Sequence, residues 1–251
     1  MKILSIIGAR PQFIKEAVIQ NEINKFDGIE EIVVHTGQHY DGCMSSVFFD
    51  VFKMRNPNYN LGIQGKKHGE MTGKMIIEIE KIILMENPDV ILLYGDTNST
   101  LAGAIAASKL KIKIAHIEAG LRQEPKDMPE EINRVLTDRI SDYLFTPSKL
   151  ASGNLAKEGI TKGVYFTGDV MYDLYLKMRS KFDYSLIRKM GLKENDYIVM
   201  TLHRDFNVDN PSKLESILTE INHISEEIPV VFPIHPRTRN RIREYGFKDL
   251  I

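Results

Sequence analysis

Short apolar runs alternate with longer amphipathic stretches along the whole chain. Apolar runs of this length, bounded by glycine or polar turns, predict buried strands of a parallel sheet, and the stretches between them predict helices. In the first part of the chain, the predicted strands are residues 2–8, 31–36, 89–94, 112–117, 143–146 and 164–167. The helices predicted between them are residues 11–25, 44–52, 70–85 and 148–158, one that ends at residue 110 and one that begins at Pro129.

The pattern changes after Gly168, where one long helix is expected from Val170 to about Lys189 as a connector. Strands 197–202 and 229–234, with a helix at 211–227 between them and a final helix after them, then repeat the alternation. Repeated units of this kind join through right-handed crossovers and form a parallel sheet, so the predicted fold class is α/β. We expect two domains: residues 1–168, and residues 169–251 with the connector helix and an incomplete second Rossmann-like sheet.

Composition narrows the class of protein. The chain has 251 residues, of which 43% are hydrophobic, and this is enough to bury a sizeable core. Lys and Arg total 33 against 34 Asp and Glu, so no overall charge favours nucleic acid or a membrane surface. The single cysteine, Cys43, excludes an intrachain disulfide and suits a reducing compartment. The first apolar run is too short for a signal peptide and no run approaches a membrane span, so a cytoplasmic protein is expected.

Charged side chains gather just beyond the apolar run 112–117. They are Glu118, Arg122, Glu130, Glu131 and Arg134. Open α/β sheets bind ligands outside the carboxyl ends of their strands, which favours a site here. The alternative is a Glu130–Arg134 salt bridge, four residues apart, on a solvated helix that starts at Pro129. The second carboxylate and second arginine at the strand end make a site the better interpretation.

Two other strand ends carry candidate chemistry. Gly8, Arg10 and Pro11 combine a turn, a cation and a helix N-terminus, with Lys15 further along, and free backbone N–H groups there would favour a phosphate. Neither the dinucleotide fingerprint nor a P-loop is present. Asp96 follows the strand 89–94 and fits either a site or a plain N-cap of the next helix.

The second part of the chain ends both of its strands with a histidine and an arginine. The pairs are His203 with Arg204, and His235 with Arg237. Two such pairs suggest an anionic ligand at that edge of the sheet. No spacing of His and carboxylates resembles a metal-ligand set, so no metal is expected.

Together these segments resemble the non-hydrolysing UDP-N-acetylglucosamine 2-epimerases, in the family's order and over almost the whole chain. The matching motifs are Gly8-Ala-Arg-Pro-Gln-Phe-Ile-Lys15, Thr36-Gly-Gln-His39, Gly95-Asp-Thr97, His116-Ile-Glu-Ala-Gly-Leu-Arg122, Pro129-Glu-Glu-Ile-Asn-Arg134, Thr201-Leu-His-Arg204 and Pro233-Ile-His-Pro-Arg-Thr-Arg239.

This resemblance implies two Rossmann-like domains of the glycosyltransferase-B type, with a UDP-sugar between them and no cofactor. It also implies inversion at carbon 2 of a UDP-2-acetamido sugar, by elimination of UDP to a 2-acetamidoglucal and re-addition, for polysaccharide precursors. A cytoplasmic homodimer is implied as well. The carboxylates and cations would stabilise charge on the sugar and the diphosphate, and acid/base groups would act on both faces of carbon 2.

The family's site residues carry over position by position. The catalytic positions are Asp96, Glu118, Glu130 and His203, and the substrate or UDP-binding positions are Arg10, Lys15, Glu131, Arg134, Arg204 and His235.

The sequence also departs from the family. Phe206 stands where the family commonly has a glutamate, and family segments that grip the nucleotide beyond Ile251 are not in this sequence, so an incomplete second domain is expected. Two alternatives therefore remain beside UDP-N-acetylglucosamine epimerisation. One is a 2-epimerase of UDP-2,3-diacetamido-2,3-dideoxyglucuronate. The other is an inactive nucleotide-sugar-binding module. A related hydrolase or glycosyltransferase activity is also left open.

Overall fold

The chain forms two compact units, Met1–Ser180 and Lys181–Ile251, in a computed structural model that describes residues 1–38, 51–65 and 67–251. Each unit is described by itself. The helix expected at 44–52 lies outside the described residues except for Val51 and Phe52, and so does His39 of the family motif. The predicted α/β class is confirmed by parallel sheets in both units.

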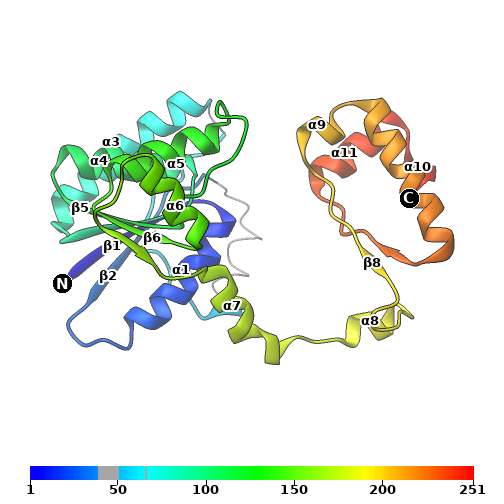
Figure 1. Ribbon diagram of the computed structural model, residues 1–251, viewed down its shortest axis with the longest axis horizontal. Helices are drawn as coiled ribbons and strands as arrows, with labels where there is room; N and C mark the ends of the chain where they lie inside the picture. Colours follow the sequence, from blue (N-terminus) through cyan, green and yellow to red (C-terminus); the bar gives the residue numbers. More distant parts are fainter. Residues whose placement is uncertain (39–50, 66) are drawn as a thin grey trace. The chain divides into compact units, whose positions relative to one another are not determined.

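The first unit is built on a seven-stranded parallel sheet in the order β3-β2-β1-β4-β5-β6-β7 (Figure 1). Its strands are β1 (Lys2–Ile7), β2 (Glu30–His35), β3 (Tyr59–Asn60), β4 (Val90–Tyr94), β5 (Lys113–Ile117), β6 (Tyr143–Thr146) and β7 (Val164–Phe166). Six of them are the strands predicted from apolar runs. The edge strand β3 was not predicted, because two residues are too few to show a period.

Helices cover both faces of this sheet. They are α1 (Arg10–Ile23), α3 (His68–Glu86), α4 (Asn98–Lys109), α5 (Pro129–Ile140), α6 (Lys149–Lys157) and α7 (Val170–Met178). Leu4 and Ile6 of β1 belong to the core cluster under α3 and α4, whereas Ile3 and Ile7 belong to the cluster that includes Phe13 of α1. Because successive side chains of a strand point to opposite faces, a sheet covered on both sides needs continuous apolar runs.

The chain reverses its winding direction between β1 and β4, the neighbours at the centre of the sheet. In such sheets, the crevice for a ligand lies outside the carboxyl ends of the two strands at this switch point. Gly8 leaves β1 there in tight packing: a Cβ on Gly8 would lie 2.1 Å from Thr36 Oγ1 and 2.3 Å from Ser99 Oγ. Gly95 leaves β4 at the same edge with φ +63°, a conformation that glycine adopts without strain.

The prediction of a single long helix from Val170 to Lys189 is wrong. The segment is divided into α7, a 3-10 turn (Arg179–Lys181) and α8 (Ser185–Lys189). Asp183 accepts hydrogen bonds from the backbone N and Oγ of Ser185, both at 2.7 Å, and such local side-chain bonds compete with helix continuation. Helix α7 belongs to the first unit, where Lys177 Nζ lies 2.7 Å from Glu22 Oε1 of α1.

The second unit holds a small parallel sheet of β8 (Ile198–Val199) and β9 (Val230–Val231). Its helices are α9 (Asp205–Val208), α10 (Pro211–Glu227) and α11 (Pro236–Tyr245), followed by a 3-10 turn (Lys248–Leu250). Leu202, Val208, Leu214, Leu218 and Ile242 form its buried core. The strands are shorter than the predicted runs 197–202 and 229–234.

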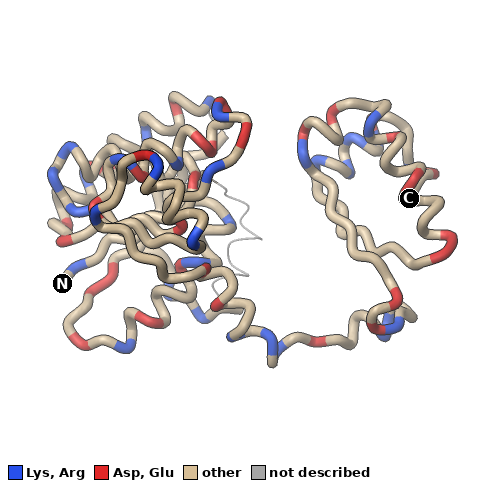
Figure 2. The backbone as a smooth tube through the Cα atoms, in the orientation of Figure 1, with Lys and Arg blue, Asp and Glu red and all other residues tan. Residues whose placement is uncertain are grey.

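Basic and acidic residues are interspersed along both units (Figure 2). Among the described residues, no helix combines the length and the apolar character needed to span a bilayer.

Helix α1 buries a carboxyl group against the sheet. Glu16 is fully buried, and its Oε2 accepts a hydrogen bond of 2.5 Å from the hydroxyl of Tyr94. Burial raises the pKa of Glu16 well above the ordinary carboxyl range, and the nearby Glu31 carboxylate raises it further. The folded chain therefore keeps a proton here that the unfolded chain releases.

Replacing Glu16 with glutamine should make stability less dependent on pH. A raised carboxyl pKa means that the folded state binds more protons than the unfolded state above about pH 4.3, so this group lowers stability as pH rises. Urea unfolding at pH 5 and pH 8 should show a smaller loss of stability at pH 8 for Glu16→Gln than for the unmodified chain. The control, Glu30→Gln, changes an exposed glutamate at the start of β2 and should leave the difference unaltered. An equal loss in Glu16→Gln and the unmodified chain would contradict a neutral Glu16.

Candidate active site

An ion pair between Glu118 and Lys15 lies at the carboxyl edge of the sheet. Glu118 follows β5 directly and has φ +73°, which is unusual for a residue with a side chain. Its Oε2 pairs with Nζ of Lys15, which is almost fully buried on α1. Gly95 borders the pair, since a Cβ there would lie 3.1 Å from Glu118 Oε2. Burial lowers the pKa of Lys15, while the negative charges of Asp96 and Asp169 act in the opposite direction.

A second group of charges joins α5 to the turn after β4. Arg134 is buried and pairs with two carboxylates, Asp96 through Nη2 and Glu131 through Nη1. Asn133 Nδ2 donates to the carbonyl O of Asp96 at 2.9 Å. Asp96 is not the N-cap of α4, because Thr97 takes that position and accepts from Thr100 N. The carboxylate of Asp96 therefore pairs with Arg134 and does not cap α4, and about a third of the Asp96 side chain is exposed.

Helix α5 turns its polar face inward and its apolar face outward. The buried residues are Glu131, Asn133, Arg134, Thr137 and Asp138, and the exposed apolar residues are Ile132, Val135, Leu136 and Ile140. The Glu130–Arg134 salt bridge considered from the sequence is not formed. Glu130 is exposed and has no hydrogen bond or ion pair with the described part of the chain, whereas Arg134 pairs with Glu131. The signal that the sequence analysis missed is the recurrence of polar residues at helical spacing along this segment, which marks the polar face that α5 buries.

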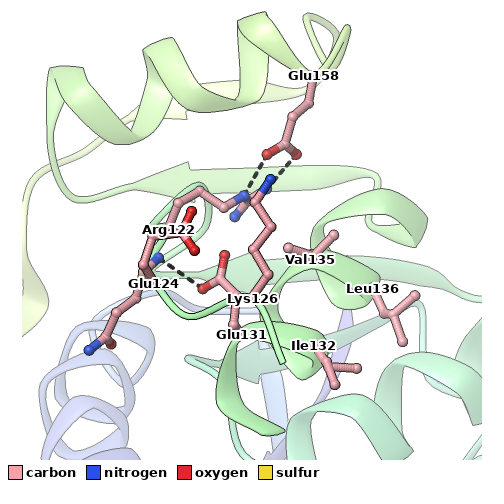
Figure 3. A pocket seen from close by; sticks show the side chains of 9 residues that line it. Arg122, Glu124, Lys126, Glu131, Ile132, Val135, Leu136 and Glu158 are labelled. Carbon is pink, nitrogen blue, oxygen red and sulfur yellow. Dashed lines mark hydrogen bonds and ion pairs between the residues drawn. The ribbon is translucent and has the colours of Figure 1, made fainter. Parts of the chain in front are cut away.

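Arg122 fastens the loop between β5 and α5. It forms a two-pronged pair with Glu158, the residue that caps the end of α6, with Nε and Nη2 each 2.6 Å from a carboxylate oxygen (Figure 3). Glu131 accepts a hydrogen bond of 3.0 Å from the backbone N of Gln123 in the same loop. These residues line a cavity of about 530 Å³, which the apolar side chains of Ile132, Val135 and Leu136 complete.

The backbone amides of Gly8 and Ala9, just before α1, are not open to a phosphate as expected. The side-chain Oε1 of Gln12 accepts from Gly8 N at 2.8 Å and from Ala9 N at 3.0 Å. Its Nε2 donates to the carbonyl O of Tyr94 at 2.9 Å, so Gln12 ties the turn after β1 to the end of β4. A glutamine at the third helical position is the capping-box signal that could have revealed this role. Arg10 is exposed at the first position of α1.

In the second unit the predicted strand-end histidines do come together. The rings of His203 and His235 lie 5.2 Å apart, and Arg204 is exposed beside His203. His235 is the N-cap of α11, and its Nδ1 accepts from Arg237 N at 3.2 Å. Phe206, at the position where the family commonly has a glutamate, is exposed on α9.

The described residues include no group of three or more His, Cys, Asp or Glu side chains that could hold a metal ion. In the first unit, the sequence-predicted residues Lys15, Asp96, Glu118, Glu131 and Arg134 form two charged groups beside Gly95. In the first group one carboxylate, Glu118, faces Lys15, and in the second two carboxylates, Asp96 and Glu131, face Arg134. Such a site can exchange protons and stabilise positive charge on a substrate.

The fold and the site define the class of protein: a doubly wound α/β protein that holds paired carboxylates and cations at the switch point of its sheet. The particular family follows from comparison: a family model described as UDP-N-acetylglucosamine 2-epimerase matches residues 21–249. The chain belongs to this family.

Individual relatives agree. The chain is 50% identical over its whole length to a UDP-N-acetylglucosamine 2-epimerase homolog of Methanococcus maripaludis, and covers 70% of that protein. It is also 50% identical to UDP-2,3-diacetamido-2,3-dideoxy-D-glucuronate 2-epimerase of Pseudomonas aeruginosa, over 99% of this chain and 70% of that protein. Among solved structures, UDP-GlcNAc 2-epimerase of Methanocaldococcus jannaschii, in complex with UDP-GlcNAc and UDP, matches with a TM-score of 0.87 and 44% identity. That match covers 99% of this chain and 70% of the other.

Proposed function

We propose that this protein is a UDP-sugar 2-epimerase that interconverts UDP-N-acetylglucosamine and UDP-N-acetylmannosamine. The observation that carries the proposal is the pair of charged groups beside Gly95, Lys15 with Glu118 and Arg134 with Asp96. Epimerisation at carbon 2 needs acid/base groups for both faces of that carbon, and two separately held carboxylates meet this requirement.

The proposed reaction has two halves. In the first, the bond between carbon 1 and the diphosphate oxygen breaks, UDP leaves with the electron pair, and a base removes the proton on carbon 2. The double bond of a 2-acetamidoglucal then joins carbons 1 and 2. In the second half, UDP adds back to carbon 1 while a proton is delivered to the opposite face of carbon 2. The sugar carries positive charge as the carbon–oxygen bond breaks, and nearby carboxylates stabilise that charge.

We assign Glu118 and Asp96 to the sugar, as the groups that move protons or stabilise charge at carbons 1 and 2. Lys15 holds Glu118 in place and Arg134 holds Asp96, so neither carboxylate needs to reorganise during the reaction. Glu131 orients Arg134 from the other side. Glu130 stays a candidate acid or base, since its exposed carboxylate at the start of α5 has no partner among the described residues.

Basic side chains outside these pairs, in either unit, are candidates for binding UDP. Arg10 and Arg204 are exposed, and His203 and His235 lie together at one edge of the small sheet. Imidazole and guanidinium groups donate hydrogen bonds to phosphate oxygens, and both suit a leaving diphosphate. We assign these four residues to UDP binding, with His203 also a candidate for catalysis.

The alternative substrate is UDP-2,3-diacetamido-2,3-dideoxyglucuronate, favoured by the Pseudomonas aeruginosa relative of that specificity at 50% identity. Incubating the protein with each UDP-sugar, and separating the products by anion-exchange chromatography, distinguishes the two. The proposal predicts UDP-N-acetylmannosamine from UDP-N-acetylglucosamine, at a higher kcat/KM than for the diacetamido sugar. The reverse preference would establish the alternative. Free N-acetylmannosamine with UDP would indicate a hydrolase, and no product from either sugar would support a non-catalytic module. A cytoplasmic homodimer stays part of the proposal.

A further inference from the structure

A buried carboxylate, Asp138 of α5, contacts residues on both sides of Glu118, the imidazole ring of His116 and the backbone of Gly120. Its Oδ1 lies 2.8 Å from Nδ1 of His116, and its Oδ2 accepts from the backbone N of Gly120 at 3.0 Å. His116 and Gly120 stand two residues before and two residues after Glu118. The side chains of Asp138 and His116 are both fully buried.

The same group reaches the turn that carries Asp96. The second ring nitrogen of His116, Nε2, lies 2.8 Å from the carbonyl O of Gly95, the residue just before Asp96. Asp138 thus connects, directly and through one imidazole, the two turns that hold Asp96 and Glu118. Arg122 Nη1 completes the group by donating to Asp138 Oδ2 at 2.8 Å.

The hydrogen-bond partners define the protonation state of the ring. A carbonyl oxygen can only accept, so His116 Nε2 donates to Gly95. Oδ2 of Asp138 accepts from two donors, Gly120 N and the Arg122 guanidinium, and this pairing with a permanent cation keeps the Asp138 carboxyl group ionised. His116 Nδ1 therefore donates as well. A ring that donates from both nitrogens is an imidazolium.

Glu118 needs such a restraint. Its φ of +73° lies in the left-handed region, which a residue with a side chain keeps only where its surroundings enforce it. Contacts to Phe145 O from the backbone N of Glu118 and of Ala119, each 3.1 Å, hold the turn from β6, and Asp138 holds it from α5.

We propose that Asp138 and the His116 imidazolium form a clamp that positions the carboxylates of Asp96 and Glu118 relative to each other. Neither residue is a catalytic group, since both are buried behind the turns. Each acts through the backbone that it holds.

Asp138→Asn tests the clamp with a variant of the same shape. Its amide oxygen can still accept from Gly120 N and Arg122, but its NH₂ group must then face His116 Nδ1, so the ring becomes neutral. We expect kcat to fall roughly 10-fold in Asp138→Asn and roughly 10²-fold in Asp138→Ala, with KM within about 3-fold, because misplaced groups slow the chemical step.

The matched control is Asp142→Asn. Asp142 accepts from Ile114 N at 3.0 Å and pairs with Lys113 at 2.5 Å, so it plays the same structural part at the opposite end of β5. This variant should change the melting temperature at most and leave kcat unchanged. An equal fall of kcat in Asp142→Asn and Asp138→Asn would contradict positioning and indicate general loosening of the strand, and an unchanged kcat in Asp138→Asn would also contradict it.

The kcat measurements rest on the proposed epimerase function. A spectroscopic measurement tests the protonation of His116 without any substrate. In the ¹⁵N spectrum of histidine-labelled protein at pH 7.5, His116, assigned with His116→Gln, should show two protonated ring nitrogens. In Asp138→Asn, one of them should shift to the position of an unprotonated nitrogen. A wild-type ring with one unprotonated nitrogen would overturn the clamp as drawn. If the wild-type protein epimerises neither UDP-sugar, the proposed function fails and the spectrum still tests the clamp.

Discussion

Replacing Glu118 with glutamine is expected to reduce kcat by roughly 10³-fold while UDP binding changes by less than about 3-fold. Glutamine keeps the shape of the side chain and can still accept from Lys15, but it neither takes a proton nor carries negative charge. The defect should therefore appear in the chemical step, as measured by single-turnover conversion of UDP-N-acetylglucosamine, and not in the affinity for UDP, as measured by titration calorimetry.

Glu86→Gln provides the control for this experiment. Glu86 also pairs with a lysine, Lys2, at 3.3 Å, but at the amino edge of the same sheet. That variant should retain wild-type turnover. Comparable turnover in Glu118→Gln and Glu86→Gln would remove Glu118 from the reaction.

Replacing Arg134 with leucine should have the largest effect on stability. The guanidinium neutralises Asp96 and the buried Glu131, and removal of one partner of a buried ion pair costs about 3–5 kcal/mol because the remaining charge is left uncompensated. Urea unfolding should show this loss, and turnover should fall with it because the Asp96 carboxylate is no longer held.

Two further variants make the Arg134 result specific. Arg139→Leu removes an exposed arginine from the same helix and should change stability by no more than about 0.5 kcal/mol. The double variant Arg134→Leu with Glu131→Gln should recover part of the lost stability, since the buried negative charge is gone. If Arg134→Leu unfolds at the same urea concentration as the wild type, the pairing does not stabilise α5 against the sheet.

Much of the fold could be predicted because apolar runs are long and well separated in this chain. The bounds of β6 and α10 match their predicted residues. Helix α10 has a clear start signal: Pro211 opens it, and Asn210 caps it by accepting from Lys213 N. The connector was misjudged because apolar spacing continues through residues 170–189, while the break depends on the side chain of Asp183 bonding to Ser185.

The sequence predicted which residues belong to the candidate site, but it did not predict which of them form ion pairs with each other. Asp96, Glu118, Lys15 and Arg134 do gather at the carboxyl edge of the sheet. Yet a four-residue spacing suggested Glu130 as the neighbour of Arg134, and Glu131 takes that place. A helix usually buries its apolar stripe and exposes its charged residues. Helix α5 does the opposite, because its polar side chains are used by the site.

The buried clamp of His116 and Asp138 illustrates the same limit. Neither residue has a sequence neighbour that signals its partner, since the contact joins β5 to α5 across 22 positions. Only the packed structure brings the imidazole between Asp138 and the carbonyl of Gly95.

Proton NMR of UDP-N-acetylglucosamine with the protein in deuterium oxide tests the central claim most directly. If the groups around Gly95 remove and replace the proton on carbon 2, deuterium will appear at that carbon as the manno epimer forms, and both will appear roughly 10³-fold more slowly with Glu118→Gln. Formation of the manno epimer with its original proton retained would contradict a proton-exchange mechanism. Equal exchange by Glu118→Gln and the wild type would contradict the site.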